Sequence, residues 1–156
     1  MDQSPTVNRR SFLGTAAGVA VVAVLPAAPA NATPDSLEAA IREVVGSAKL
    51  NPGKVMLELP PLVENGNTVP MKVSVESPMT AKDHVKAIHV FNEKNPQPHV
   101  LNAYIGPRAG KAGIAAHIKL ADSQKVVAIA ELSDGTFWIA SADVIVTIAA
   151  CTEDVG

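Results

Sequence analysis

The apolar positions that follow the N-terminal segment begin at helical spacing. Leu37, Ile41 and Val44 recur every three or four residues, which is the period of a helix with one buried face. Pro34 suits the first turn of such a helix, because the N–H that proline lacks would have no partner there, and Gly46 suits the end. The pattern predicts a single helix that ends at Gly46.

The rest of the chain consists of short segments rich in valine and isoleucine, separated by turn-forming clusters such as Asn51-Pro52-Gly53. Regular spacing of such segments predicts an all-β fold, an immunoglobulin-like antiparallel β-sandwich, behind the one N-terminal helix. The clearest hairpin turn is Ser133-Asp134-Gly135, where glycine can take the positive φ that closes the turn. The predicted strands are 54–59, 69–75, 84–92, 100–105, 113–120, 125–132, 136–139 and 143–149.

The last predicted strand is apolar on both faces. Val144, Val146 and Ile148 alternate on one face and Ile145 lies on the other, whereas a strand with one solvent-facing side would alternate with polar residues. Either other elements of the chain cover both faces, or one face is a contact surface for another protein. We favour the contact surface, because a domain of this size has little material to cover both sides.

An export signal precedes the predicted domain. Arg9 and Arg10 stand directly before Ser-Phe-Leu and the uncharged apolar run 16–28, which is the pattern of a twin-arginine signal peptide. The run is too short and interrupted for a membrane-spanning helix, and small residues favour cleavage between Ala30 and Ala32. We therefore expect a signal peptide at 1–32, a sandwich domain at 33–149, a C-terminal tail at 150–156, and a periplasmic mature protein that is not bound to the membrane.

Composition and charge exclude one class of partner. The chain has 13 lysines and arginines against 15 aspartates and glutamates, and a formal net charge of -2. A nucleic-acid-binding protein needs a concentrated basic surface to displace the counterions of the phosphates. No run of basic residues supplies one, so we expect no nucleic-acid partner.

Cys151 is the only cysteine in the chain. It cannot form a disulfide within the chain, although the periplasm is oxidising. A lone thiol in an exported protein is a reactive group, one half of an intermolecular bridge, or a buried inert residue. Its place near the C-terminus argues against deep burial, because terminal residues usually fray.

Metal binding and catalysis are weaker hypotheses for this chain. Met56, Met71 and Met79 together with histidines could suit copper, but His84 and His89 are five positions apart and would point to opposite faces of a strand. Scattered methionines are more often core filler. No spacing places a histidine beside the cysteine as a base. We expect no metal site and no catalytic residue.

Several stretches, in their order and spacing, carry a resemblance to a known family, although no single one is a specific motif. The stretches are the Arg9-Arg10-Ser11-Phe12-Leu13 leader, 69–89 (VPMKVSVESPMTAKDHVKAIH), Lys94-Asn95-Pro96, 106–110 (GPRAG), 120–138 (LADSQKVVAIAELSDGTFW) and the closing VIVTIAAC. Together they make the chain similar, over essentially its whole length, to SoxY, the sulfur-carrier subunit of the periplasmic thiosulfate-oxidising (Sox) system.

The resemblance implies a fold, partners and a site. It implies an immunoglobulin-like sandwich that forms a heterodimer with an obligate SoxZ-like subunit. It also implies a cysteine near the C-terminus that holds the sulfur intermediate covalently while separate Sox enzymes oxidise it and release sulfate. By this resemblance Cys151 is the covalent sulfur carrier, the chain is not itself an enzyme, and it needs no cofactor apart from the bound sulfur intermediate.

The sequence departs from the family at the cysteine itself. The family's carrier cysteine lies in a Gly-Gly-Cys-Gly-Gly tail, whereas Ala149 and Ala150 precede Cys151 here and Thr152 follows it. Either Cys151 works in a variant arm, or a glycine-rich arm with the active cysteine belongs beyond Gly156. In the second case this chain would be a non-covalent scaffold. We favour Cys151, because it is the only thiol present.

The arm and its charges restrict how Cys151 can work. If the last strand ends near Ala149, two residues extend the thiol by at most about 7 Å, and alanine lacks the backbone freedom of glycine. Glu153 and Asp154 disfavour a thiolate beside them and repel a free sulfur oxyanion. We therefore expect slow capture of sulfur without help, and faster capture in the positive cleft of an enzyme.

Overall fold

The computed structural model describes residues 34–150 of the chain, which form one helix and nine strands. The helix α1 (Pro34–Val45) begins and ends where its apolar period does, and Gly46 follows it with a φ of 63°. The strands are β1 (Leu50–Pro52), β2 (Val55–Glu58), β3 (Leu62–Val63), β4 (Val69–Val75), β5 (Val85–Asn92), β6 (His99–Tyr104), β7 (Ala112–Ile118), β8 (Gln124–Leu132) and β9 (Phe137–Val146), with a short 3₁₀ turn, η1 (Pro107–Ala109), before β7.

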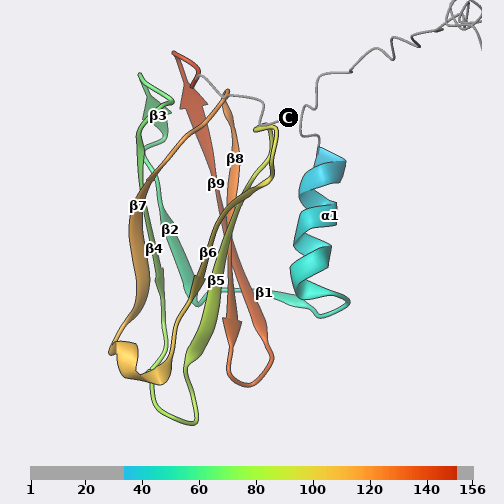
Figure 1. The fold of residues 1–156 in the computed structure, drawn as a ribbon, viewed down its shortest axis with the longest axis vertical. Coiled ribbons are helices and arrows are strands. Elements are labelled where there is room, and N and C mark those ends of the chain that lie inside the picture. Colours follow the sequence, from blue (N-terminus) through green and yellow to red (C-terminus); the bar gives the residue numbers. More distant parts are fainter. Residues whose placement is uncertain (1–33, 151–156) are drawn as a thin grey trace, which may run out of the picture.

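The strands form two sheets that pack face to face, which confirms the predicted β-sandwich. The larger sheet has the order β1-β9-β8-β5-β6, with β3 also paired to β9, and the smaller sheet has the order β2-β4-β7. Figure 1 shows the two sheets nearly edge-on, with α1 lying against the outer face of the larger sheet. The element order therefore builds three layers, helix, large sheet and small sheet.

Strand β8 shows why its sequence is apolar almost throughout. Val126, Ala128 and Ala130 face the small sheet and have no exposed surface, while Val127 and Ile129 face the helix and are also buried. A strand covered on both sides loses the alternation of apolar and polar residues. The helix thus covers one face of β8, and its own apolar face completes a second, smaller core.

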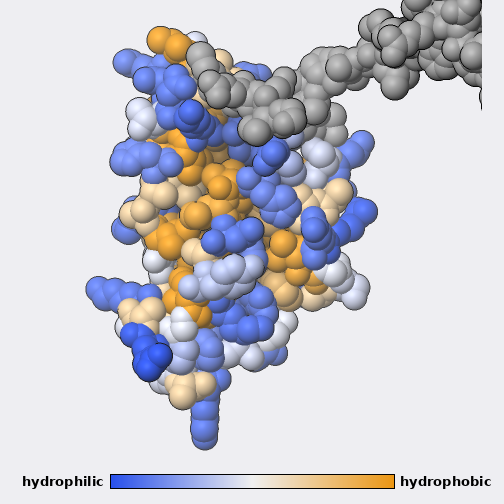
Figure 2. Space-filling model, viewed as in Figure 1, coloured by the Kyte–Doolittle hydropathy of each residue, from blue (hydrophilic) through white to orange (hydrophobic). Residues whose placement is uncertain are grey.

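The open edge of the sandwich lies between β6 and β7, which are edge strands of the two different sheets. Figure 2 shows apolar surface in the middle of this view, over the gap between these strands. Five half-buried side chains from this region pack against the main core, namely Val100, Leu101, Ile105, Ile114 and Ala116. The core is therefore closed less completely at this edge than at its centre.

Three details of the predicted strands are wrong. Predicted strands 136–139 and 143–149 are one strand, β9, because Ser141 and Ala142 continue the antiparallel ladder opposite Val127 and Val126 of β8. Strand β9 also ends at Val146 and not near Ala149. Strands β1 and β3, with three and two residues, were not predicted because so few residues show no period.

The predicted hairpin turn between β8 and β9 is confirmed, and Asp134 stabilises it. Gly135 has a φ of 80°. One carboxylate oxygen of Asp134 accepts hydrogen bonds from the N–H of Thr136 at 2.9 Å and from its hydroxyl at 2.7 Å. These two bonds hold the pKa of the Asp134 carboxyl below its usual range.

We expect Asp134→Ala to lower the free energy of unfolding slightly, by about 0.5 kcal/mol at neutral pH, because the two bonds are exposed to solvent. A carboxyl whose folded-state pKa is lowered stabilises the fold above its unfolded-state pKa and loses that contribution as pH falls through the folded-state value. In urea unfolding, the free energies of unfolding of variant and wild type should therefore differ at pH 7 and should be equal at strongly acid pH. Asp143→Ala, at an exposed position of β9 outside the turn, is the control, and an equal effect from it would contradict the role of Asp134.

Candidate functional site

The end of β9 and the segment that follows it are attached to the body of the protein by a series of hydrogen bonds. The N–H of Ile145 donates to the carbonyl of Pro61 at 2.9 Å, and that of Thr147 to the carbonyl of Val63 at 3.0 Å. The hydroxyl of Thr147 donates to the carbonyl of Glu64 at 3.2 Å. These bonds continue the parallel pairing of β3 with β9 beyond the last strand residue.

Gly66 joins this segment to a third part of the chain. Its N–H donates to the carbonyl of Ile148 at 2.8 Å, and its carbonyl accepts from the N–H of Leu120, also at 2.8 Å. The carbonyl of Leu120 in turn accepts from the N–H of Ala150 at 3.0 Å, and Ala150 is buried. We call residues 147–150, with their partners Val63, Gly66 and Leu120, the tail root.

Only glycine fits at position 66 in this arrangement. A Cβ there would lie 2.4 Å from the carbonyl oxygen of Leu120, 2.9 Å from the backbone nitrogen of Ala150 and 3.0 Å from a methyl of Val146. The first two contacts are with backbone atoms, which cannot turn aside as a flexible side chain can. The close approach of three chain segments at the tail root therefore depends on the missing side chain of Gly66.

The predicted site residues Cys151, Arg9 and Arg10 lie outside the described residues, but the attachment of Ala150 bears on the first of them. Covalent geometry keeps the Cα atom of Cys151 within about 3.8 Å of the Cα atom of Ala150. The reach of the cysteine was predicted from a strand that ends near Ala149, whereas β9 ends at Val146 and residues 147–150 are then held to the body by further hydrogen bonds. Only one peptide unit therefore separates the anchored Ala150 from the cysteine.

Apolar side chains are exposed beside the tail root. Leu62 and Ile145 are partners in the parallel pair β3–β9, with 58% and 59% of their surface exposed, and Ile148 is 64% exposed. On the other face of β9, Val144 is buried and Val146 packs against the main core. Of the two alternatives for the last strand, the described chain therefore covers the inner face and leaves Ile145 uncovered.

An ion pair lies near the tail root. Ser123 accepts the N–H of Val146 at 2.9 Å, which places the loop containing Asp122 beside the end of β9. Lys94 donates to the Asp122 carboxylate at 2.9 Å, and this bond lowers the pKa of the Asp122 carboxyl. The basic residue Arg108 lies in η1 before β7, at the opposite end of that strand from Leu120 (Figure 1).

Two of the histidines considered for a metal have other hydrogen-bond partners. Nδ1 of His84 is 3.1 Å from the carbonyl of Thr80, and Nδ1 of His89 is 2.8 Å from Oδ1 of Asn102. Residues 34–150 contain no group of three or more histidine, cysteine, aspartate or glutamate side chains placed to hold a metal ion. Met71 and Met79 are buried in the main core as expected of core filler, but Met56 is 57% exposed and is not core filler.

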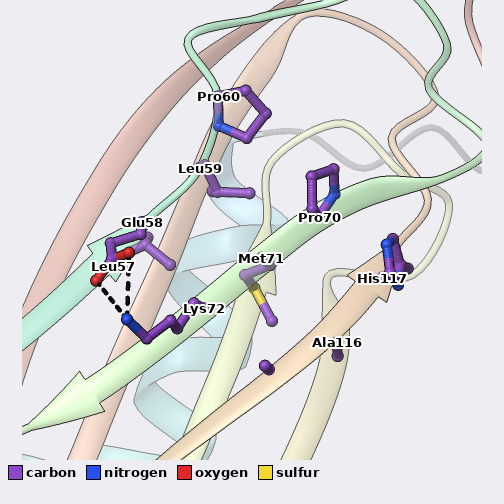
Figure 3. Close-up of a pocket in the computed structure, with 10 residues that line it drawn as sticks. Leu57, Glu58, Leu59, Pro60, Pro70, Met71, Lys72, Ala116 and His117 are labelled. Carbon is purple, nitrogen blue, oxygen red and sulfur yellow. Dashed lines mark hydrogen bonds and ion pairs between the residues drawn. The ribbon is translucent and has the colours of Figure 1, made fainter.

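A groove of about 620 Å³ lies at the small sheet, between β2, β4 and β7 (Figure 3). Lys72 Nζ reaches across to Glu58 at 3.1 Å, so the two charges in the groove neutralise one another. The remaining lining is mainly apolar and proline-rich, with His117 at one side. The groove has no unpaired charged group to fix a small anion, and we assign it no ligand.

Comparisons with known proteins agree with the fold. The sequence model of the family "Sulfur oxidation protein SoxY" matches residues 41–151 and thus includes the cysteine. The sulfur carrier protein SoxY from Chlorobium limicola f thiosulfatophilum is 25% identical, with a TM-score of 0.62, over 73% of this chain and 98% of that chain. None of the curated proteins matches this chain.

Superoxide reductases share the architecture. The neelaredoxin from Ignicoccus hospitalis is 19% identical with a TM-score of 0.55, over 75% of this chain and 95% of that chain. A putative superoxide reductase from Thermotoga maritima is 20% identical with a TM-score of 0.52, over 63% of this chain and 87% of that chain. At this identity the likeness concerns the fold alone.

The fold and the site together define a small β-sandwich protein whose sole cysteine directly follows an anchored chain segment. Because the family match spans more than half of the sequence, the chain belongs to the SoxY family of sulfur oxidation proteins. Membership indicates a role in sulfur oxidation. Among residues 34–150 no helix is long and apolar enough to cross a membrane.

Sequence reasoning missed the residues that make the tail root. Gly66 lies in the stretch Glu64-Asn65-Gly66-Asn67, which has the composition of an ordinary turn, and its neighbours Leu120 and Ala150 are distant in the sequence. No local pattern shows that three such segments meet. The exposed isoleucines were partly anticipated, because the two apolar faces of the last strand had indicated a contact surface.

Proposed function

We propose that this chain is a covalent sulfur carrier of thiosulfate oxidation and that Cys151 is the attachment site. The observation that supports it most strongly is that the SoxY family match runs through Cys151, the only cysteine. The anchored residue Ala150 adds to this, since it offers the thiol from a defined place on the body. The proposed role is that of a substrate for other enzymes, without catalysis by the chain itself.

The chemistry of loading requires an oxidant. The Cys151 thiol first loses its proton, and the thiolate sulfur then forms a bond to the terminal sulfur of thiosulfate while two electrons leave. We propose that a redox enzyme accepts both electrons. Water then attacks the outer sulfur and releases sulfate and two protons, and the sulfane sulfur remains on the cysteine as a persulfide anion. No metal or other cofactor on this chain takes part.

The acidic tail makes an enzyme's help necessary in this proposal. Glu153 and Asp154 repel the thiosulfate dianion and disfavour the Cys151 thiolate, so free thiosulfate should react slowly. An enzyme with a basic cleft reverses both effects, because it attracts the tail and the dianion together. The charges around the cysteine thus favour reaction inside an enzyme over reaction in solution.

The remaining parts of the proposal concern location and assembly. Arg9 and Arg10 fit export by the twin-arginine pathway, which would deliver the folded chain to the periplasm. Family membership supports a heterodimer with a SoxZ-like subunit. Because the twin-arginine pathway exports folded proteins, the SoxZ-like subunit could bind this chain in the cytoplasm and cross the membrane together with it.

Intact-mass measurement tests the proposal. The exported protein, together with its SoxZ-like subunit, is incubated with thiosulfate and the redox enzyme, and we expect the chain to gain the mass of one thiosulfate unit on the peptide that contains Cys151. Omission of the enzyme is the control and should leave nearly all of the protein unmodified. An unmodified mass in the complete mixture would favour the alternative function, a non-covalent scaffold with an inactive arm. The alanines that replace the family's glycines before Cys151 are the feature that favours this alternative.

A further inference from the structure

The outward side of β9 changes character along its length. Phe137 and Ile139 pack into the cluster beneath the helix, and Ser141 and Asp143 are exposed and polar. Beyond the helix an apolar residue returns at Ile145, where neither the helix nor another described element covers it. A single exposed apolar residue is common on protein surfaces, whereas a group of such residues marks a contact surface.

Exposed apolar residues are concentrated at this end of the molecule. The described chain exposes five large apolar side chains, and three of them, Leu62, Ile145 and Ile148, lie at or beside the tail root. Leu62 and Ile145 are direct neighbours across the β3–β9 pair, and the carbonyl of Ile148 is bonded to Gly66. We call these three residues the apolar collar.

The length of the arm determines what can lie over the apolar collar. Ala150 is anchored through its N–H, and the thiol belongs to the next residue. A long flexible arm could carry its cysteine into a deep active site while the body stayed outside. An arm of one peptide unit, about 3.8 Å, cannot do this, so a protein that acts on Cys151 must bring its own surface against the tail root.

We infer that the apolar collar is the docking surface for the enzyme that loads sulfur onto Cys151, an inference that rests on the proposed function. The collar residues would pack against an apolar rim around the active site of this enzyme. The tail beyond them carries Glu153 and Asp154, so the cleft inside the rim is basic. The partner is therefore a redox enzyme with a positively charged cleft and an apolar entrance.

Binding of the unreactive chain tests the inference without relying on sulfur transfer. The Cys151→Ser chain, in complex with its partner subunit, is titrated against the redox enzyme, with and without Ile145→Ser or Ile148→Ser. Each collar substitution should weaken binding about tenfold, because it removes a half-exposed apolar side chain from the contact. Met56→Ser is the matched control, because Met56 is 57% exposed but lies on the small sheet. The Met56→Ser chain should bind the redox enzyme as tightly as the parent chain does.

Loading kinetics on the chain with Cys151 intact give a second readout. Ile145→Ser and Ile148→Ser should raise the KM for the carrier about tenfold and leave kcat nearly unchanged, since the collar contributes to docking and not to the chemistry. A small thiol reagent should titrate Cys151 at the wild-type rate in all variants. A loss of thiol titration together with a raised KM would indicate a damaged tail and would overturn the docking role.

Other outcomes overturn the inference in distinct ways. Unchanged affinity and KM in both collar variants would exclude the collar as a docking surface. If Ile145→Ser dissociates the partner subunit, the collar is the contact surface for that subunit. If the wild type self-associates and Ile145→Ser abolishes this, the collar is the contact surface for a second copy of the chain. If the enzyme binds the collar but no sulfur adduct forms on the wild type, the proposed function fails and the docking surface stands.

Discussion

Replacement of Gly66 by alanine is expected to lower the free energy of unfolding by about 2–3 kcal/mol. The new Cβ would lie 2.4 Å from the carbonyl oxygen of Leu120 and 2.9 Å from the nitrogen of Ala150, and relief of these contacts requires a shift of backbone on both sides. The hydrogen bond between Leu120 and Ala150 would lengthen or break. Urea unfolding monitored by circular dichroism measures the loss.

Gly106→Ala is the matched control for this change. Gly106 lies in a loop with a φ of -114°, and a Cβ added there meets nothing within 4 Å. The control should therefore unfold within about 0.5 kcal/mol of the wild type. If Gly66→Ala is as stable as Gly106→Ala, the packing at the tail root does not have the role described.

A spin label separates the local effect of Gly66→Ala from its effect on global stability. Because Cys151 is the only cysteine, a nitroxide reagent labels a single position next to Ala150. Under conditions where both variants are folded, the electron paramagnetic resonance lines should be narrower in Gly66→Ala than in the wild type or Gly106→Ala. Identical line shapes would mean that the root does not restrict the cysteine.

The second large effect is expected at the cysteine. Cys151→Ser should abolish the enzyme-dependent sulfur adduct completely, because a serine hydroxyl cannot form the sulfur–sulfur bond that holds the intermediate. Intact-mass measurement on the loaded complex detects the loss directly. The difference is qualitative, adduct against no adduct, and does not depend on small changes in rate.

The controls for Cys151→Ser concern the fold and the partner subunit. Serine differs from cysteine by one atom, so the unfolding transition should shift by no more than about 0.5 kcal/mol, and binding to the partner subunit should be unchanged. Ser123→Ala would not be a suitable control, because Ser123 bonds to Val146 at the end of β9. An adduct that persists on the Cys151→Ser chain would place the carrier function elsewhere.

Most of the fold was accessible from the sequence for specific reasons. The helix α1 has a clear apolar period between Pro34 and Gly46, and the turn around Asp134 has the composition that a tight hairpin needs. Strands β4, β5 and β8 are long enough for their valine-rich and isoleucine-rich runs to be recognised as strands. Strands β1 and β3 are not, and both exist because β9 offers a free edge for parallel pairing, which no local pattern encodes.

The site was accessible only in part. The sequence singled out Cys151 as the sole thiol, and the resemblance to SoxY supplied a use for it. The attachment of Ala150 could not be foreseen, because it depends on Leu120 and on the absence of a side chain at Gly66. The unbroken course of β9 was missed because polar Ser141 interrupts an apolar run, whereas in the structure it is simply the outward member of the ladder.

The position of β9 within the larger sheet has a mechanical consequence. This strand is bonded to β8 along one side and to β1 and β3 along the other, and the tail root continues in the same direction. Tension applied at the C-terminal end would therefore act along the strand and load many hydrogen bonds in shear at once, instead of peeling them apart singly. In the proposed carrier function, an enzyme that pulls on the tail would therefore load β9 along its length.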